Sequence, residues 1–265
     1  MGEMKVGSLF SGIGGLDLGL ERAGMEIVWL VEKDPYCQKV LKKHWPEVPC
    51  YGDIKEIDFA TIAPVDLICG GDPCPIRSRA RSNGKSRHAD LSGYFLAVVG
   101  VMRPFWVVRE NVLAPDDKDF EAALDLLGYR SIIIRTDASE VTGQSRQRDF
   151  IVGSHNLSWP EFAMQLPDMQ DGPGPYSTRL GTRQVIPALT AHRTRYDSRD
   201  CYVWDGQLRI LDAKERQAFA GVPDGWLDGL SEAAISGMCG RAVVPQVAEW
   251  IGRIIMQADK GAPHV

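Results

Sequence analysis

The stretch from Lys5 to Leu20, KVGSLFSGIGGLDLGL, decides the fold of this chain. It starts as a short apolar strand over residues 5–10, turns through Ser11, Gly12, Gly14 and Gly15, and continues as a leucine-rich helix. Glycines between a strand and a helix let the backbone approach a nucleotide-like ligand closely. This local pattern is common, so its meaning depends on the segments beyond it.

Strand-like and helix-like segments alternate through the first 155 residues. Apolar strands are expected over residues 27–31, 66–69, 106–109, 131–135 and 150–153, and helices over residues 35–44 and 120–127. This alternation predicts an α/β fold with a doubly wound, mostly parallel sheet, in which ligands bind at the carboxyl ends of the strands. From residue 157 to 204 the chain is rich in Pro, Gly, Arg and Thr without periodicity, and helices return over residues 212–220 and 244–256.

Composition is that of a protein with a real core. The 265 residues are 44% hydrophobic and 25% charged, which excludes a disordered tail protein, a collagen and a small disulfide scaffold. No apolar run approaches the roughly 18 residues of a membrane helix, and no secretory signal is visible, so a cytoplasmic protein is expected. Six cysteines without paired CxxC spacing argue against both zinc and disulfides, and no metal is expected.

The net charge of −5 does not by itself suggest a nucleic-acid partner. Two cationic stretches do: Arg77, Arg79, Arg81, Lys85 and Arg87 have no acid among them, and Arg179, Arg183, Arg193, Arg195 and Arg199 are opposed mainly by Asp197. Such runs are often merely solvated surfaces. Two of them in an acidic protein favour a phosphate-binding cleft.

Polar residues at the predicted strand ends carry the chemistry. Glu32 and Asp53 could contact a ribose and an adenine, although each alone is more often a cap or turn residue. Cys74, between two prolines, could be a nucleophile whose pKa nearby arginines lower, or a buried turn cysteine. Glu110 follows another strand, and a nucleophile converging with a carboxylate suits an addition–protonation mechanism.

Together these residues resemble the DNA cytosine-5 methyltransferase family, in the family's motif order over nearly the whole chain. Beside the glycine turn and Pro73-Cys74, the matching elements are Glu110-Asn111-Val112, Gln144-Ser145-Arg146-Gln147-Arg148, Ala188-Leu189-Thr190, Gly221-Val222-Pro223-Asp224 and Gly240-Arg241-Ala242-Val243. The resemblance implies a Rossmann-like methyltransferase with a catalytic and cofactor-binding domain over residues 1–156, a small target-recognition region over residues 157–205, and a segment over residues 206–265 that returns to the catalytic domain. It also implies a monomer that acts on double-stranded DNA.

The resemblance assigns roles residue by residue. Catalysis is expected from Cys74, which adds to cytosine C6, and from Glu110 at N3. Arg148 is expected to hold the base carbonyl, and Arg146 to steady the site. S-adenosylmethionine is expected to contact Phe10, Ser11, Gly12, Gly14, Gly15, Glu32, Asp53, Pro73, Arg241, Ala242 and Val243. DNA is expected to contact Arg77, Ser78, Arg79, Arg81, Lys85, Arg87, Gln144, Thr190, Arg193 and Arg195, with the base flipped out of the duplex.

Three departures from the family pattern leave alternatives open. Pro75 replaces the usual Gln after the catalytic Cys, Asp72 replaces an apolar residue, and Arg241 replaces an Asn beside the transferred methyl group. Arg241 would repel a sulfonium unless it pairs with Asp72 or a DNA phosphate, or unless the donor is carboxy-S-adenosylmethionine, which would make the protein a carboxymethyltransferase. A tRNA cytosine-5 methyltransferase and a catalytically inactive DNA-binding homologue are further alternatives.

Overall fold

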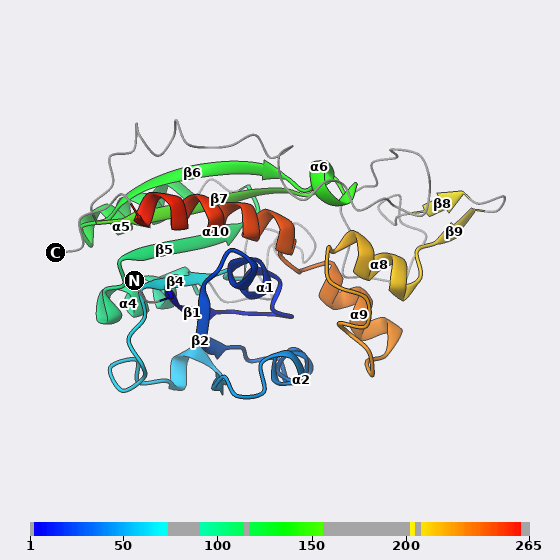
Figure 1. Cartoon of the computed structure of the whole chain (residues 1–265), viewed down its shortest axis with the longest axis horizontal. Helices are drawn as coiled ribbons and strands as arrows, with labels where there is room; N and C mark the ends of the chain where they lie inside the picture. Colours follow the sequence, from blue (N-terminus) through cyan, green and yellow to red (C-terminus); the bar gives the residue numbers. More distant parts are fainter. Residues whose placement is uncertain (1–2, 74–90, 114–116, 156–201, 205–207, 261–265) are drawn as a thin grey trace, which may run out of the picture.

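The centre of the molecule is a seven-stranded sheet with strand order β3-β2-β1-β4-β5-β7-β6. The computed structural model describes residues 3–73, 91–113, 117–155, 202–204 and 208–260 (Figure 1). The strands of the sheet are β1 (Lys5–Leu9), β2 (Glu26–Val31), β3 (Cys50–Tyr51), β4 (Leu67–Gly70), β5 (Trp106–Asn111), β6 (Arg130–Asp137) and β7 (Gln147–Ser154). β1 to β5 pair in parallel, whereas β7 runs antiparallel to both β5 and β6. The mostly parallel sheet expected from the sequence is therefore confirmed.

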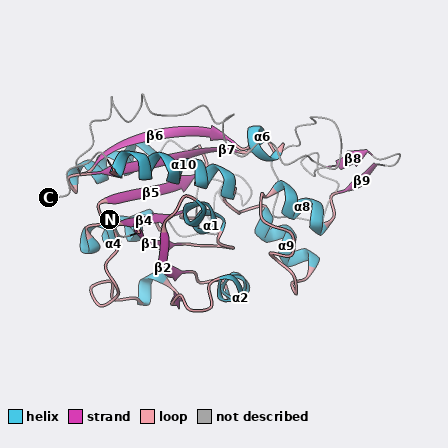
Figure 2. Ribbon diagram, viewed as in Figure 1, coloured by secondary structure: helices cyan, strands magenta, loops and turns pink. Residues whose placement is uncertain are grey.

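Helices cover both faces of this sheet (Figure 2). They are α1 (Gly15–Arg22), α2 (Pro35–His44), α4 (Ser92–Met102), α5 (Asp117–Leu126), α6 (Ser139–Thr142), α8 (Ala213–Phe219), α9 (Glu232–Cys239) and α10 (Pro245–Asp259), with a 3₁₀ turn, η1 (Ile54–Glu56). One core cluster contains the buried residues of α1, α8, α9 and α10, and the other contains those of α4 and α5. A separate antiparallel pair is formed by β8 (Tyr202–Trp204) and β9 (Leu208–Ile210).

The last helix packs directly on the first. A Cβ atom at Gly19 would clash with the Ala248 Cβ, and one at Gly252 would lie 2.7 Å from the Ala23 Cβ. Only glycine at these two positions allows α1 and α10 to approach so closely. The C-terminal segment is thereby held against the helix that comes after the glycine turn, as Figure 1 shows.

Local sequence signals explain where several helices begin. Asp34 accepts a hydrogen bond from the Tyr36 amide (2.9 Å) and Pro35 occupies the first turn of α2, which begins where the sequence predicts. Asp212 and Glu215 form a reciprocal capping box at α8. Three helices, α4, α6 and α9, are not predicted by the sequence pattern.

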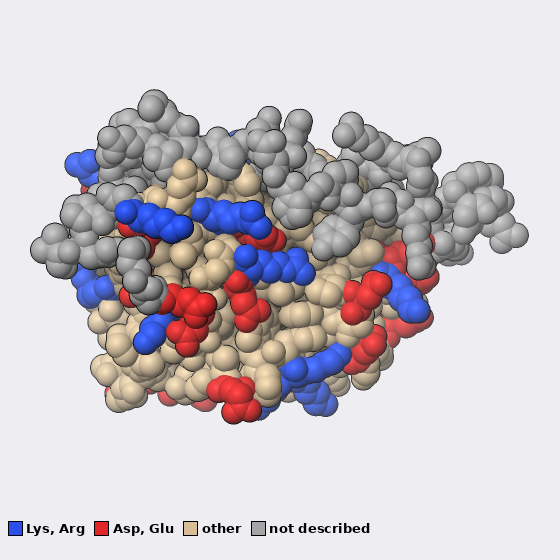
Figure 3. All heavy atoms as spheres, viewed as in Figure 1, with Lys and Arg blue, Asp and Glu red and all other residues tan. Residues whose placement is uncertain are grey.

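The outer surface around α1 and α10 mixes charges of both signs. Figure 3 shows acidic and basic side chains interspersed over the described part of this face, without a patch of a single sign. No helix in the described part of the chain is both long and apolar enough to cross a membrane.

Candidate active site at the carboxyl edge of the sheet

The glycine turn after β1 is held by the acid that ends β2. The Glu32 Oε2 atom accepts a hydrogen bond from the Gly12 amide and Oε1 accepts one from the Asp34 amide, both at 2.7 Å. The backbone of the turn is unusual, because Phe10 has a φ of 54°, in the left-handed region that residues other than glycine seldom adopt. Strain of this kind persists where the surrounding structure enforces it, and it is common at ligand-binding sites.

Two distant segments close around the same turn. A Cβ atom at Gly15 would clash with the Val243 carbonyl oxygen, so residues 240–243 sit directly on the turn. The Trp226 indole donates a hydrogen bond to the Ile13 carbonyl (2.9 Å) and stacks on His44 with ring centroids 3.4 Å apart. The structure therefore brings the expected cofactor residues Phe10–Gly15, Glu32 and Ala242–Val243 together. Trp226 also contacts this turn, although the sequence suggested no cofactor contact for it.

Asp53 lies beside Glu32, at the end of the neighbouring strand. The Glu32 amide donates to the Tyr51 carbonyl (3.0 Å), and Asp53 comes next as the cap of η1. Its carboxylate is 2.5 Å from the Lys33 Nζ atom, and this hydrogen-bonded ion pair lowers the pKa of Asp53. Glu32 and Asp53 thus follow the carboxyl ends of two adjacent strands, β2 and β3.

Arg241 does not pair with Asp72, and the prediction of that pair is wrong. The Arg241 side chain is 60% exposed, its Nη2 atom lies 3.6 Å from the Asp34 carboxylate, and its Nε donates to the Gly237 carbonyl (3.2 Å). Asp72 instead pairs with Arg109. Arg241 therefore has a carboxylate neighbour at the N-cap of α2, and Asp72 belongs to another network.

Glu110 and Arg148 form an ion pair at the carboxyl end of β5. The Arg148 Nε atom lies 2.8 Å from the Glu110 Oε1 atom, and both side chains are about nine-tenths buried. Gly71, just after β4, is so close that a Cβ atom there would lie 3.0 Å from the Glu110 Oε2 atom. Arg146, directly before β7, donates from Nη1 to the Gly240 carbonyl (3.2 Å), which links the start of this strand to the segment that covers the glycine turn. A buried acid and a guanidinium therefore lie beside the end of β4, where Pro73 is the last described residue before Cys74.

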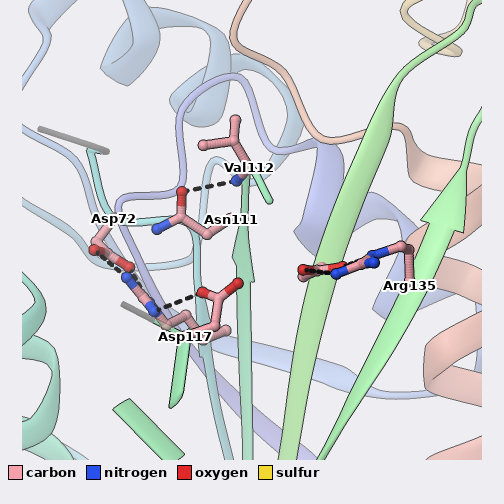
Figure 4. A network of polar contacts seen from close by, with 7 residues as sticks. Asp72, Asn111, Val112, Asp117 and Arg135 are labelled. Carbon is pink, nitrogen blue, oxygen red and sulfur yellow. Dashed lines mark hydrogen bonds and ion pairs between the residues drawn. The ribbon is translucent and has the colours of Figure 1, made fainter. Parts of the chain in front are cut away.

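A second buried network lies on the other face of β5 (Figure 4). The Arg109 guanidinium makes two parallel hydrogen bonds to the Asp72 carboxylate, 2.5 Å from Nε and 2.9 Å from Nη2, and Nη1 lies 3.3 Å from Asp117. A further pair, Arg135 with Asp149, joins β6 to β7. The sequence marked Asp72 as unusual but contained no signal for its partner, which is 37 residues away.

The structure does not describe all the expected site residues. Outside the described ranges lie the following: Cys74, Arg77, Ser78, Arg79, Arg81, Lys85, Arg87, Thr190, Arg193 and Arg195. Gln144, expected to contact DNA, is fully buried and donates from Nε2 to the Phe219 carbonyl (3.1 Å). Its place differs from that expectation, because its amide joins the turn between α6 and β7 to the end of α8 inside the protein.

Comparison with known proteins identifies the family. The profile of the C-5 cytosine-specific DNA methylase family matches residues 4–203. The type II methyltransferase M.NgoMIV of Neisseria gonorrhoeae is 27% identical, with 94% of this chain and 96% of that protein aligned. M.AquIA of a Picosynechococcus species is 31% identical over 78% of this chain and 84% of its own length.

Solved structures share the fold at lower identity. A DNMT2 mutant of Spodoptera frugiperda superimposes with a TM-score of 0.73 at 17% identity, covering 96% of this chain and all of that one. The methyltransferase EhMeth of Entamoeba histolytica gives 0.72 at 15% identity, with 99% of this chain and all of that one covered. With the family profile spanning about three quarters of the sequence and with the glycine turn, Glu110 and Arg148 gathered at one edge of the sheet, the chain belongs to the C-5 cytosine-specific DNA methylase family.

Proposed function

We propose that this protein transfers a methyl group from S-adenosylmethionine to C5 of cytosine in double-stranded DNA, through a covalent adduct of Cys74. The observation that carries the proposal is the buried Glu110–Arg148 pair, whose charged atoms are 2.8 Å apart. The Glu110 carboxylate lies beside Gly71, which is three residues before Cys74 in the sequence. An acid and a guanidinium at this place can bind the N3 edge and the carbonyl of one pyrimidine. An inactive homologue would have no need to keep both.

The residues around the glycine turn fit S-adenosylmethionine. Glu32 uses one lone pair of each oxygen on backbone amides, so its carboxylate is oriented and still has acceptor capacity for ribose hydroxyls. Gly14 and Gly15 leave no side chain between the turn and its neighbours, and Asp53 lies at the end of the next strand. When bound, S-adenosylmethionine supplies the electrophilic methyl carbon that cytosine C5 attacks.

The chain's own residues would activate the base. The Cys74 thiolate forms a bond to C6, and the electrons of the C5–C6 double bond become available at C5. Glu110 hydrogen-bonds or protonates N3, where charge develops, and Arg148 holds the carbonyl oxygen. After alkylation, loss of the C5 proton expels the Cys74 thiolate and restores the aromatic ring. Solvent water accepts this proton.

Binding of DNA would use the segments rich in arginine. The cations between Arg77 and Arg87 are proposed to contact phosphates, residues 157–205 to recognise the target sequence, and the protein to act as a monomer on a flipped base. Affinity for duplex DNA should then fall steeply with salt, and a tRNA should be a poor competitor. Preferred modification of tRNA in direct competition would instead support the tRNA alternative.

A trap with 5-fluorocytosine DNA tests the mechanism. Fluorine at C5 cannot leave as a cation, so the adduct with Cys74 should persist and be visible on denaturing gels when cofactor is present. Cys37, Cys69 and Cys239 should add little background, because burial raises the pKa of Cys37 and Cys239 to about 12 and that of Cys69 well above its ordinary value. Cys74→Ser should form no adduct yet still bind DNA. An adduct that survives in Cys74→Ser would contradict the role of this cysteine.

Glu110→Gln separates catalysis from binding. Because the contact of Glu110 with N3 strengthens as charge develops, the variant should lose rate on the order of 100-fold while DNA affinity changes little. Single-turnover rates and equilibrium binding measure the two effects separately. A loss confined to binding would make the acid a structural partner of Arg148.

The donor is proposed to be ordinary S-adenosylmethionine, because Asp34, 3.6 Å from Arg241, offsets the charge of the guanidinium. Carboxy-S-adenosylmethionine, with transfer of a carboxymethyl group, is the alternative, since Arg241 could bind its carboxylate. Supplying both donors in competition and weighing the nucleosides by mass spectrometry decides between them. If 5-carboxymethylcytosine were the sole product, the proposal that the donor is S-adenosylmethionine would be overturned.

A further inference from the structure

Arg109 lies in a buried network of charges that the proposed chemistry does not use. Its side chain is 1% exposed and joins the carboxylates of Asp72 and Asp117, which are 1% and 4% exposed. The guanidinium also lies over the Phe120 ring, 4.3 Å from its centroid. Burying three charges costs desolvation energy, and a well-packed apolar group would often stabilise such a site as well or better. The network therefore calls for a reason other than stability.

The geometry of β5 separates this network from the base. Arg109 and Glu110 are consecutive in the strand, so their side chains point to opposite faces of the sheet. Glu110 meets Arg148 on one face, and Arg109 meets Phe120 of α5 on the other. Arg109 thus cannot touch a base held by Glu110, and any effect it has on the reaction acts through the backbone.

The partner of Arg109 lies next to the nucleophile in the sequence. Asp72 follows Gly71, which abuts the Glu110 carboxylate, and precedes Pro73-Cys74. Two parallel hydrogen bonds between a planar guanidinium and a carboxylate fix both position and orientation, which a single bond or an apolar contact does not. The Asp72–Arg109 bonds hence fix the chain leaving β4 relative to the strand that carries Glu110.

We infer that Arg109, through its paired bonds to Asp72, is a positioning residue that sets the place of the Cys74 nucleophile relative to Glu110. The inference rests on the proposed role of Cys74. Addition to C6 needs sulfur and carbon close together and aligned, and a misplacement of about 1 Å can lower a rate on the order of 100-fold. Asp117 meets the same guanidinium at 3.3 Å, but it lies in the N-terminal turn of α5, far from Cys74 in the sequence.

Asp72→Asn and Asp117→Asn form a matched pair of variants. Each variant removes the negative charge of one carboxylate that contacts Arg109 and leaves the other carboxylate beside the guanidinium. Only Asp72→Asn loses the parallel bonds next to Pro73. The single-turnover rate of adduct formation with 5-fluorocytosine DNA, at saturating DNA and cofactor, should fall on the order of 100-fold in Asp72→Asn and within about threefold in Asp117→Asn. Dissociation constants for DNA and cofactor should stay close to wild type in both.

A second variant keeps the test decisive if Asp72→Asn does not fold. Arg109→Lys retains all three charges but cannot make the parallel bonds, so the rate of adduct formation should fall while cofactor binding persists. A wild-type rate in either folded variant, or equal losses in the two Asn variants, would overturn the positioning role. If the wild-type protein itself forms no adduct, the proposed function fails instead, so the two failures are distinguishable.

Discussion

Asp17 makes the stability of this protein depend on pH in a way that one substitution should remove. It lies in the first turn of α1, directly after the glycine turn, and is completely buried. Neither carboxyl oxygen has a hydrogen-bond partner among the described residues. Burial raises the pKa of Asp17 from 3.8 to about 7, and the nearby Ser8 hydroxyl acts in the opposite direction.

The sign and size of the effect come from proton linkage. The folded state keeps the Asp17 proton up to about pH 7, whereas the unfolded chain releases it near its ordinary pKa of 3.8. Stability is therefore fully present below the unfolded pKa and is lost as the pH rises toward the folded value. Since a tenfold change in protonation equilibrium is worth about 1.4 kcal/mol, the full loss is about 4 kcal/mol.

Asp17→Asn keeps the shape of the side chain and abolishes its titration. The difference in free energy of unfolding between variant and wild type should shift by about 3 kcal/mol in favour of the variant from about pH 4.5 to about pH 8. Urea titrations at several pH values measure it, and taking the difference cancels groups that titrate alike in both proteins. Glu26→Gln, which removes an exposed charge at the start of β2, is the control. Parallel stability curves for Asp17→Asn and wild type would refute the reasoning.

Two further predictions concern the glycine turn, which is proposed to bind the cofactor. Gly15→Ala should lose cofactor binding and thermal stability in calorimetry, because the new methyl group would clash with the Val243 carbonyl oxygen; Gly93→Ala, where no atom lies within 4 Å, should be tolerated. Unchanged cofactor affinity in Gly15→Ala would show that residues 240–243 move freely. Trp226→Phe should weaken cofactor binding measured by equilibrium titration, since the Ile13 carbonyl loses its indole donor, and a net cost of about 1 kcal/mol is expected. An affinity equal to wild type would leave this bond a purely structural role.

The missed helices show where sequence patterns fail in this chain. α4 is apolar almost all around, with Phe95, Val98 and Val99 buried and Val101 exposed, so it has no polar face to mark a helical period. α9 is short, and its strongest sequence signal is the N-cap residue Ser231, whose hydroxyl accepts a hydrogen bond from the Ala234 amide. Elements with clear alternation or caps, such as α2, are predicted with their observed bounds.

The sequence by itself determined most of the strands and helices, the glycine turn, and the acids that end the strands, because each of these depends on residues close together in the chain. It also marked Glu110 and Arg148 as members of one site. Only the tertiary structure decided which charges meet: Asp72 with Arg109 across 37 residues, Arg241 with Asp34, and Trp226 with Ile13 across 213 residues. Contacts of this kind depend on which faces the sheet and helices turn toward one another, and local patterns do not specify the partner of a buried charge.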